Sequence, residues 1–159
     1  MAIKFFDMFA GIGGFRSGLE AIGGFECVGY CEIDKYAKQS YEAMYDTKGE
    51  LYFNDARKIN PKELPDIDLI TGGFPCQSFS IAGARKGFDD TRGTLFFEIA
   101  RIAAVKKPKY LFLENVPGLL NHDEGKTFET ILRTLDELGY DVCWQVLNSK
   151  NFGVPQSRN

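Results

Sequence analysis

The sequence predicts an α/β fold in which helices cover both faces of a mostly parallel sheet. Short apolar runs alternate along the chain with segments of helical periodicity, a pattern typical of such layered folds. The first apolar run continues into a glycine-rich turn and a helix, which is how nucleotide-binding βαβ units begin. Acidic residues also follow several of the predicted strands, at the end where open α/β sheets bind ligands. Together these observations favour a ligand-binding α/β domain.

The composition is that of one ordinary globular domain, expected over residues 1–159, with 44% hydrophobic and 26% charged residues. No apolar run is long enough to cross a bilayer and no signal-peptide pattern is present, so a cytoplasmic location is expected. With one histidine and four scattered cysteines, neither a zinc site nor a disulfide framework is expected. The net charge of −3 does not favour nucleic-acid binding. A DNA-binding surface would therefore be local or lie in a segment absent from this chain.

The first predicted strand, residues 3–8, runs into the turn at residues 9–15 and a helix over residues 16–22. Glycines let the backbone come close to a ligand, and the N-terminus of the helix favours a carboxylate or phosphate there. The match to the G-x-G-x-x-G pattern is incomplete, because Arg16 stands where the third glycine would be. A plain strand-to-helix turn is the alternative interpretation.

The second predicted strand, residues 25–31, ends at Glu32, which lies 21 residues after Gly11 (32 − 11). Nucleotide-binding folds place an acid at this distance to hold ribose hydroxyls. Alternatively, Glu32 merely precedes the next helix, for which Asp34 is a good N-cap. That helix carries an apolar stripe at helical spacing, interpreted as core: Ala37, Tyr41 and Met44.

The third predicted strand, residues 51–53, is followed by Asp55, either a second ligand-binding acid or a turn residue. The fourth strand, residues 67–71, leads into the loop Gly72–Ser80, in which proline precedes Cys76 and polar residues follow it. The two glycines of this loop would let another molecule approach the main chain. We interpret Cys76 as a reactive thiol, with a small buried hydrophobe as the alternative.

Residues 77–93 are polar and punctuated by glycines, and such a long connection in a compact domain is typical of a lid over a site. A helix over residues 94–105 and a fifth strand over residues 109–113 follow. The fifth strand ends at Glu114, beside the strand that leads to Cys76 if the order is sequential.

In the last part of the chain, His122 is interpreted as a solvated or loop-ordering residue. A helical stripe between residues 128 and 138 is closed by Gly139. A sixth strand is predicted over residues 140–147, with an antiparallel hairpin among the last strands.

Four short motifs stand in an order and at a spacing that resemble the cytosine-C5 DNA methyltransferases of the bacterial modification-methylase type. The resemblance covers nearly the whole chain and is carried by Phe9–Phe15, Pro75-Cys76-Gln77, Glu114-Asn115-Val116 and Gln156-Ser157-Arg158.

The resemblance implies a Rossmann-like, S-adenosylmethionine-dependent methyltransferase fold with no metal. It also implies a role for each residue of the cofactor pocket. These residues are Phe9 at the adenine, Gly11, Gly13 and Gly14 under the methionine part, Glu32 at the ribose hydroxyls, Asp55 at the adenine amino group, and Ile33, Ala56, Pro75 and Leu95 in the lining.

The resemblance further implies that the substrate is cytosine in double-stranded DNA, flipped out of the helix because C6 is inaccessible within a duplex. Cys76 would add to C6, since cysteine is a strong nucleophile at neutral pH. Glu114 would hold N3 and N4, and Arg158 would grip O2. The predicted phosphate contacts are Ser80, Arg85 and Arg92.

Members of the family continue beyond the Gln-x-Arg motif with a target-recognition region and a final segment. We therefore expect a chain that is incomplete at its C-terminus, with a complementing fragment or subunit as its partner. Its setting would be the bacterial cytoplasm, at the nucleoid, in a restriction-modification system. The alternatives are a catalytically silent fragment, and a nicotinamide-dependent dehydrogenase suggested by the glycine turn and Glu32.

Overall fold

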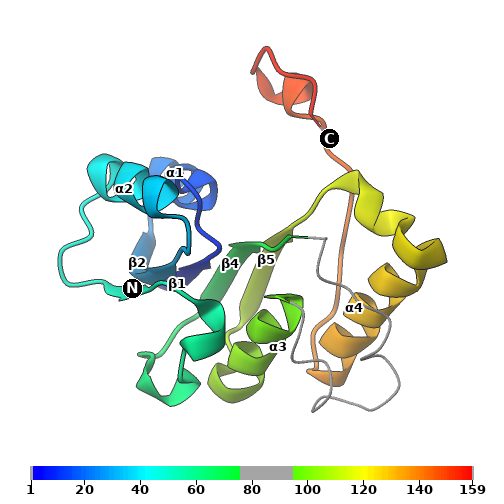
Figure 1. Ribbon diagram of the computed structural model, residues 1–159, viewed down its shortest axis with the longest axis horizontal. Helices are drawn as coiled ribbons and strands as arrows, with labels where there is room; N and C mark the ends of the chain where they lie inside the picture. The colour runs from blue at the N-terminus through cyan, green and yellow to red at the C-terminus, as the bar shows by residue number, and fades with distance from the viewer. Residues whose placement is uncertain (1, 76–94, 159) are drawn as a thin grey trace. The chain divides into compact units, whose positions relative to one another are not determined.

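A computed structural model describes residues 2–75 and 95–158 of the chain (Figure 1). The chain divides into two compact units, Met1–Glu114 and Asn115–Asn159. The first unit contains a five-stranded parallel sheet of order β3-β2-β1-β4-β5. The strands are β1 (Ile3–Met8), β2 (Phe25–Cys31), β3 (Leu51–Phe53), β4 (Leu69–Gly73) and β5 (Tyr110–Glu114).

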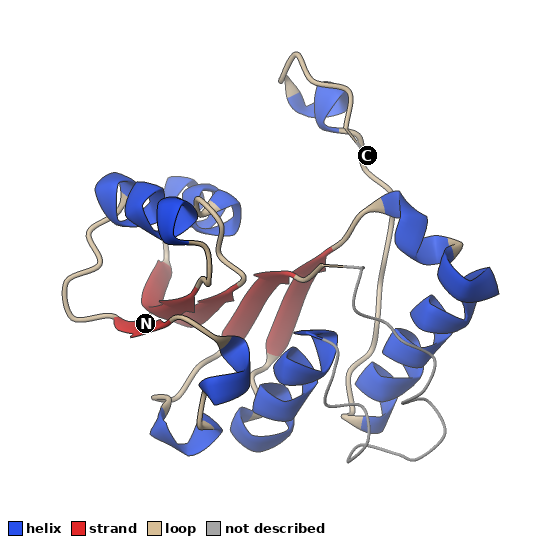
Figure 2. Ribbon diagram, in the orientation of Figure 1, coloured by secondary structure: helices blue, strands red, loops and turns tan. Residues whose placement is uncertain are grey.

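Helices lie on both sides of this sheet, α1 and α2 on one side and α3 on the other (Figure 2). The helices of the first unit are α1 (Gly14–Ile22), α2 (Lys35–Met44) and α3 (Leu95–Lys106), with the short 3₁₀ helices η1 (Ala56–Lys58) and η2 (Pro61–Glu63). The second unit has α4 (Lys126–Glu137) and the 3₁₀ helices η5 (Pro117–Leu120), η6 (His122–Gly125) and η7 (Ser149–Phe152). Among the described residues, no helix is long and apolar enough to span a bilayer.

The central strand β1 is buried on both faces, as expected for a parallel sheet covered by helices. On one face Phe5 packs with Leu19 of α1 and with Leu69. On the other face Phe6 meets the ring of Phe53 edge-on, with 5.9 Å between the ring centroids. The core therefore forms two layers, one on each side of the sheet.

Close packing also explains Gly72, for which the sequence suggested the approach of another molecule. A Cβ atom at Gly72 would lie 3.3 Å from the Ile99 Cδ1 atom of α3 and 3.3 Å from the Met8 carbonyl oxygen. The missing side chain lets α3 pack tightly against β4. A side chain at Gly72 would meet the protein's own core, so the glycine serves the packing of this strand.

The predicted elements of the first unit are present, with ends that differ by up to two residues. Asp34 caps α2 as predicted, because its side chain accepts a hydrogen bond from the Ala37 N–H at 2.7 Å. The predicted apolar stripe of α2 is wrong at one end, since Tyr41 is fully buried but Met44 is 57% exposed. The helix ends at Met44, so this last side chain extends beyond the part of α2 that covers the sheet.

The predicted sixth strand is also wrong. Residues 140–148 form no strand, and the side chains of residues 141–147 are exposed. Trp144 packs edge-on against Phe128 of α4, with 5.2 Å between ring centroids. A strand needs a neighbour to accept its backbone hydrogen bonds, and no strand in the described part of the chain pairs with this segment. The expected hairpin is therefore absent from the described residues.

Two smaller predictions for the second unit are confirmed. Gly139 follows α4 with φ 87°, and its N–H donates to the Asp136 carbonyl at 2.8 Å, as at a glycine C-cap. His122 lies 2.7 Å from the Thr127 hydroxyl through Nδ1, which ties η6 to the start of α4. His122 therefore orders the polar segment before α4.

Candidate active site

The glycine turn joins β1 to α1 through an unusual backbone. Phe9, Gly11 and Gly13 have φ values of 54°, 56° and 87°, in the left-handed region that favours glycine. The Ala10 N–H donates to the Cys31 carbonyl at 3.0 Å, which ties the turn to the end of β2. A Cβ atom on Gly11 or Gly14 would meet nothing within 4 Å. The turn therefore offers an open stretch of backbone at the carboxyl end of the sheet.

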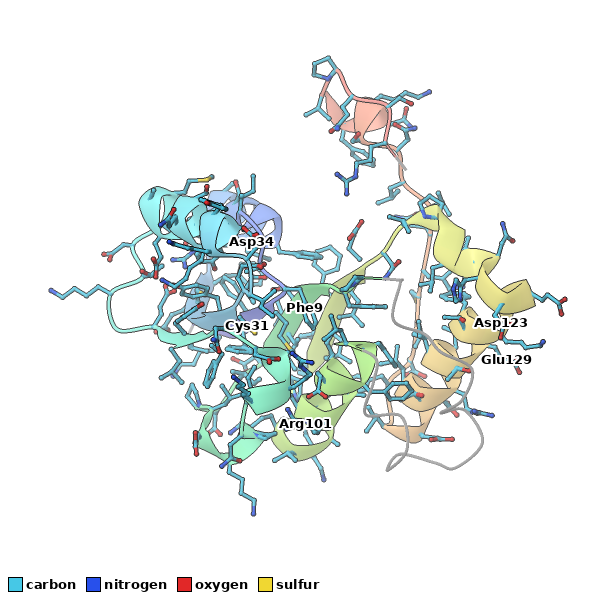
Figure 3. The ribbon with its side chains drawn as sticks, in the orientation of Figure 1. Phe9, Cys31, Asp34, Arg101, Asp123 and Glu129 are labelled. Carbon is cyan, nitrogen blue, oxygen red and sulfur yellow. The ribbon has the colours of Figure 1, made fainter. Side chains whose placement is uncertain are left out.

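Glu32 connects this turn to the start of α2. One oxygen of its carboxylate accepts the Gly11 N–H at 2.7 Å, and the other accepts the Asp34 N–H at 2.7 Å. Gly11 and Glu32, whose separation of 21 residues was the sequence signal, are thus in direct contact in the structure. Figure 3 labels Phe9, Cys31 and Asp34, which mark the end of β1, the end of β2 and the start of α2.

Asp55 follows β3, the strand next to β2, and the Glu32 N–H donates to the Phe53 carbonyl at 3.1 Å. The side chain of Asp55 accepts the Arg57 guanidinium at 2.9 and 2.8 Å and caps η1 through the Arg57 N–H. The hydrogen bonds from Arg57 hold the pKa of the Asp55 carboxyl below its usual range. Asp55 is therefore an ionised acceptor at the same edge of the sheet as Glu32.

The predicted lining residues differ in exposure. Ile33 is 70% exposed, which suits a side chain that covers a ligand, whereas Ala56, the first residue of η1, is 3% exposed. Pro75 is exposed after β4, and Leu95 is half-buried at the start of α3. Ile33 is therefore the one of these four with a large free apolar surface.

Glu114 is the last residue of β5 and stands beside Gly73 of β4 in the sheet register. A Cβ atom on Gly73 would lie 3.0 Å from the Glu114 Oε2 atom, so the carboxylate occupies the space that a side chain would fill. The chain leaves β4 through Phe74 and Pro75. The predicted neighbourhood of the strand before Cys76 and the strand that ends at Glu114 is confirmed.

Some predicted site residues lie outside the described residues, namely Cys76, Ser80, Arg85, Arg92 and the segment interpreted as a lid. Arg158 belongs to the second unit, where its carbonyl accepts the Ser149 N–H at 2.8 Å. Its N–H donates to the Asn148 side chain at 3.3 Å. Its position is thus defined within its own unit.

A buried polar network beneath the glycine turn was not predicted. Asp7 is fully buried and accepts hydrogen bonds from the Thr71 hydroxyl at 2.7 Å and the Tyr41 hydroxyl at 3.3 Å. Arg16 donates to Tyr41 at 3.3 Å and makes two hydrogen bonds of 2.9 Å to the carboxylate of Glu50. The sequence held two signals for this network. One is Asp7, a polar residue inside an apolar strand, and the other is Arg16, an arginine at a glycine position.

Two of the described cysteines, Cys27 and Cys31, are not candidates for nucleophilic chemistry. Burial raises the pKa of the Cys27 and Cys31 thiols to about 12, so neither forms a thiolate at neutral pH. Cys143 is exposed and lies in the second unit. No cluster of His, Cys, Asp or Glu in residues 2–75 and 95–158 could hold a metal ion.

The fold and the turn define a class, the doubly wound α/β proteins that bind a nucleotide-like ligand at the carboxyl edge of the sheet. The C-5 cytosine-specific DNA methylase family matches residues 3–159, and the chain belongs to this family. The nicotinamide-dependent dehydrogenase suggested by the glycine turn has no such support.

Named relatives place the chain in the same family. It is 49% identical over 156 residues to the type II methyltransferase M.HhaI of Haemophilus parahaemolyticus, covering 98% of this chain and 46% of that protein. It is 49% identical over 157 residues to the orphan methyltransferase M.SPRI of Bacillus phage SPR, covering 98% of this chain and 36% of that protein. The chain thus spans less than half the length of these two relatives.

Among solved structures, a DNA modification methyltransferase encoded within a prophage of E. coli superposes with a TM-score of 0.76 at 26% identity. The superposition covers 99% of this chain and 44% of that one. The Rossmann-like methyltransferase fold is thereby confirmed.

Proposed function

We propose that this chain is the cofactor-binding and catalytic part of a DNA (cytosine-5-)-methyltransferase that uses S-adenosylmethionine as methyl donor. The observation that carries the proposal is the hydrogen bond of 2.7 Å between the Gly11 N–H and Glu32. It holds the acid at the end of the next strand against the glycine turn, at the edge where such folds bind a nucleoside. The substrate would be double-stranded DNA, in the bacterial cytoplasm.

The residues at this edge fit the cofactor. Each carboxylate oxygen of Glu32 accepts one backbone N–H, which leaves a lone pair on each for a ribose hydroxyl. Ile33 is 70% exposed and offers an apolar face to an adenine ring, while the ionised Asp55 can accept its amino group. The open backbone at Gly11 and Gly14 leaves room for the methionine part. Phe9, Gly13, Ala56, Pro75 and Leu95 complete the pocket in this proposal.

Bound S-adenosylmethionine would supply an electrophilic methyl group for cytosine C5. In our proposal the Cys76 thiolate adds to C6 of a flipped cytosine, and the ring electrons move toward C5. Glu114 would hold N3 and N4 and favour protonation at N3, which draws negative charge out of the ring as the sulfur adds. C5 would then take the methyl group, leaving S-adenosylhomocysteine, and loss of the C5 proton would expel the thiolate. Arg158 would hold O2.

The register of β4 and β5 supports this pairing of roles. Gly73 and Glu114 are direct neighbours, and Cys76 follows Gly73 by three residues (76 − 73). The proposed phosphate contacts remain Ser80, Arg85 and Arg92.

A partner that supplies further DNA-binding surface is part of the proposal. Specific protein–DNA interfaces bury roughly 1,000–2,500 Å² of protein, and this chain carries a net charge of −3. Phe112 is 56% exposed and Tyr110 is 49% exposed on β5, the last strand of the described sheet. A C-terminal fragment or subunit would cover the exposed apolar side chains of β5 and would also contribute basic surface for binding DNA. A catalytically silent subunit is the competing proposal.

Isothermal titration with S-adenosylhomocysteine tests the cofactor site. We expect wild-type protein to bind, and Asp55→Ala to weaken binding about tenfold, because a hydrogen bond to a charged acceptor contributes about 1.5–3 kcal/mol. Asp66→Ala is the matched control, since Asp66 is a fully exposed aspartate remote from the strand ends. Equal heats from wild type and Asp55→Ala would contradict the placement of the adenine.

Methyl transfer to duplex DNA tests the reaction. We expect no measurable turnover by the 159-residue chain alone. Turnover should appear when the segment that follows the matched region in a relative is added in trans, and Cys76→Ser should abolish it. Turnover that survives Cys76→Ser would refute the assigned nucleophile, and a mixture without turnover would favour the silent subunit.

A further inference from the structure

Tyr45 contacts the glycine turn at a different point from Glu32. Its hydroxyl donates to the Gly13 carbonyl at 2.8 Å, and that carbonyl also accepts the Ser17 N–H of α1 at 2.8 Å. A Cβ atom on Gly13 would lie 2.8 Å from the Tyr45 hydroxyl oxygen and 2.9 Å from its Cζ atom. The ring therefore rests directly on the backbone of the turn.

The turn needs such support. Phe9 has a left-handed backbone angle of φ 54°, which is sparsely populated for a residue other than glycine, and the N-cap residue of α1, Gly13, has no side chain with which to cap the helix. Such an angle at a non-glycine residue costs about 1–3 kcal/mol and persists only where neighbouring groups hold it. Glu32 holds the turn at the Gly11 N–H, and Tyr45 holds it at the Gly13 carbonyl.

Tyr45 is itself fixed in place. It is half-buried at the end of α2, where its N–H donates to the Tyr41 carbonyl at 3.0 Å. The Arg16 guanidinium lies 4.6 Å from the centroid of its ring, within the range of a cation–π interaction. Arg16 is in turn held by two hydrogen bonds of 2.9 Å to Glu50. The ring that contacts Gly13 is thus held in place by its own neighbours.

We propose that Tyr45 is a positioning residue for cofactor binding, which acts by fixing the turn through Gly13 without touching the cofactor. This inference rests on the proposed function, in which the turn carries the methionine part of S-adenosylmethionine. It assigns a cofactor-related task to the residue that follows α2, a helix whose apolar stripe the sequence interpretation treated as core packing.

The test compares Tyr45→Phe and Tyr45→Ala with Tyr30→Phe. Tyr30 is 1% exposed in the same aromatic cluster, and its hydroxyl donates to Glu42 of α2 at 2.6 Å, away from the turn. Each phenylalanine variant removes one hydroxyl hydrogen bond from the same region. The measurements are S-adenosylhomocysteine affinity by titration, thermal stability, and hydrogen exchange of the turn amides without ligand.

We expect Tyr45→Phe to lose affinity about threefold to tenfold and Tyr45→Ala to lose more, with faster amide exchange at residues 11–14 in both. Tyr30→Phe should lose at least as much thermal stability while keeping its affinity and its exchange rates. If affinity merely followed stability across the three variants, or if Tyr45→Phe bound like wild type, the inference would be overturned.

A wild-type protein that does not bind S-adenosylhomocysteine would contradict the proposed function. The exchange rates would then still test the support of the turn by itself. Unchanged exchange at residues 11–14 in Tyr45→Ala would refute that support in either case.

Discussion

Replacing Asp7 by asparagine should stabilise the protein at alkaline pH and remove part of its pH dependence. Asp7 is fully buried in β1, and its two oxygens accept hydrogen bonds from Thr71 at 2.7 Å and Tyr41 at 3.3 Å. Burial raises the pKa of this carboxyl from 3.8 to about 7, against the opposing effect of the two hydrogen bonds and of Arg16. Deprotonation therefore places a charge in the core.

The sign of the effect follows from proton binding. Between pH 3.8 and about 7 the folded protein holds a proton on Asp7 and the unfolded chain does not, so the free energy of unfolding falls as pH rises through this window. At about 1.4 kcal/mol per pH unit, the loss reaches at most about 4 kcal/mol above pH 7. An asparagine has the same shape, can still accept from Thr71, and carries no charge to desolvate.

Urea unfolding of wild type and Asp7→Asn at pH 5, 6, 7 and 8 measures this difference. The variant should gain stability over wild type steadily with pH, by a total of about 2–4 kcal/mol between pH 5 and 8. Asp66→Asn, at a fully exposed aspartate, should leave the pH profile of wild type unchanged. Parallel pH profiles for wild type and Asp7→Asn would refute the reasoning, because the buried carboxyl would then titrate as it does in the unfolded chain.

Two further outcomes follow from the geometry. Gly13→Ala should destabilise the protein by about 3 kcal/mol and Gly11→Ala by about 1 kcal/mol. Both residues have positive φ, but only a side chain at Gly13 would also collide with a neighbour. Equal losses of stability in thermal or urea unfolding would contradict the collision. In a Cys76→Ser background, thiol labelling of the folded protein should modify the exposed Cys143 first. Cys31 should react last, because it is 2% exposed and its thiol has a pKa of about 12. The reverse order of labelling would show that β2 opens readily.

The parts of the fold that depend on local pattern could be predicted from the sequence. The distance from Gly11 to Glu32 is a consequence of one strand, one turn and one helix of ordinary length, and the structure turns it into a hydrogen bond. The order of β4 and β5 follows from the same logic, and it places Glu114 beside Gly73.

The misses arise where a residue's partner lies far away in the chain. Arg16 stands on a surface-type helix and is buried because Glu50, 34 residues later, receives its guanidinium. The segment around Trp144 was predicted to be a strand, yet a strand forms only where a neighbouring strand pairs with its backbone. The pairing of Asp55 with Arg57 was missed although the two residues are close in the chain, because a contact between residues two positions apart produces no periodic pattern in the sequence.

The Arg16–Glu50 pair has a consequence for protein engineering. By composition the connection after α2, Asp46-Thr47-Lys48-Gly49-Glu50, looks like a tolerant surface loop suited to insertion or circular permutation. Its last side chain and its first carbonyl both hold a guanidinium that is 4% exposed. Cutting or lengthening this connection would strand a buried cation, and breaking such a pair costs about 3–5 kcal/mol. We therefore expect cleavage or insertion in this connection to destabilise the protein.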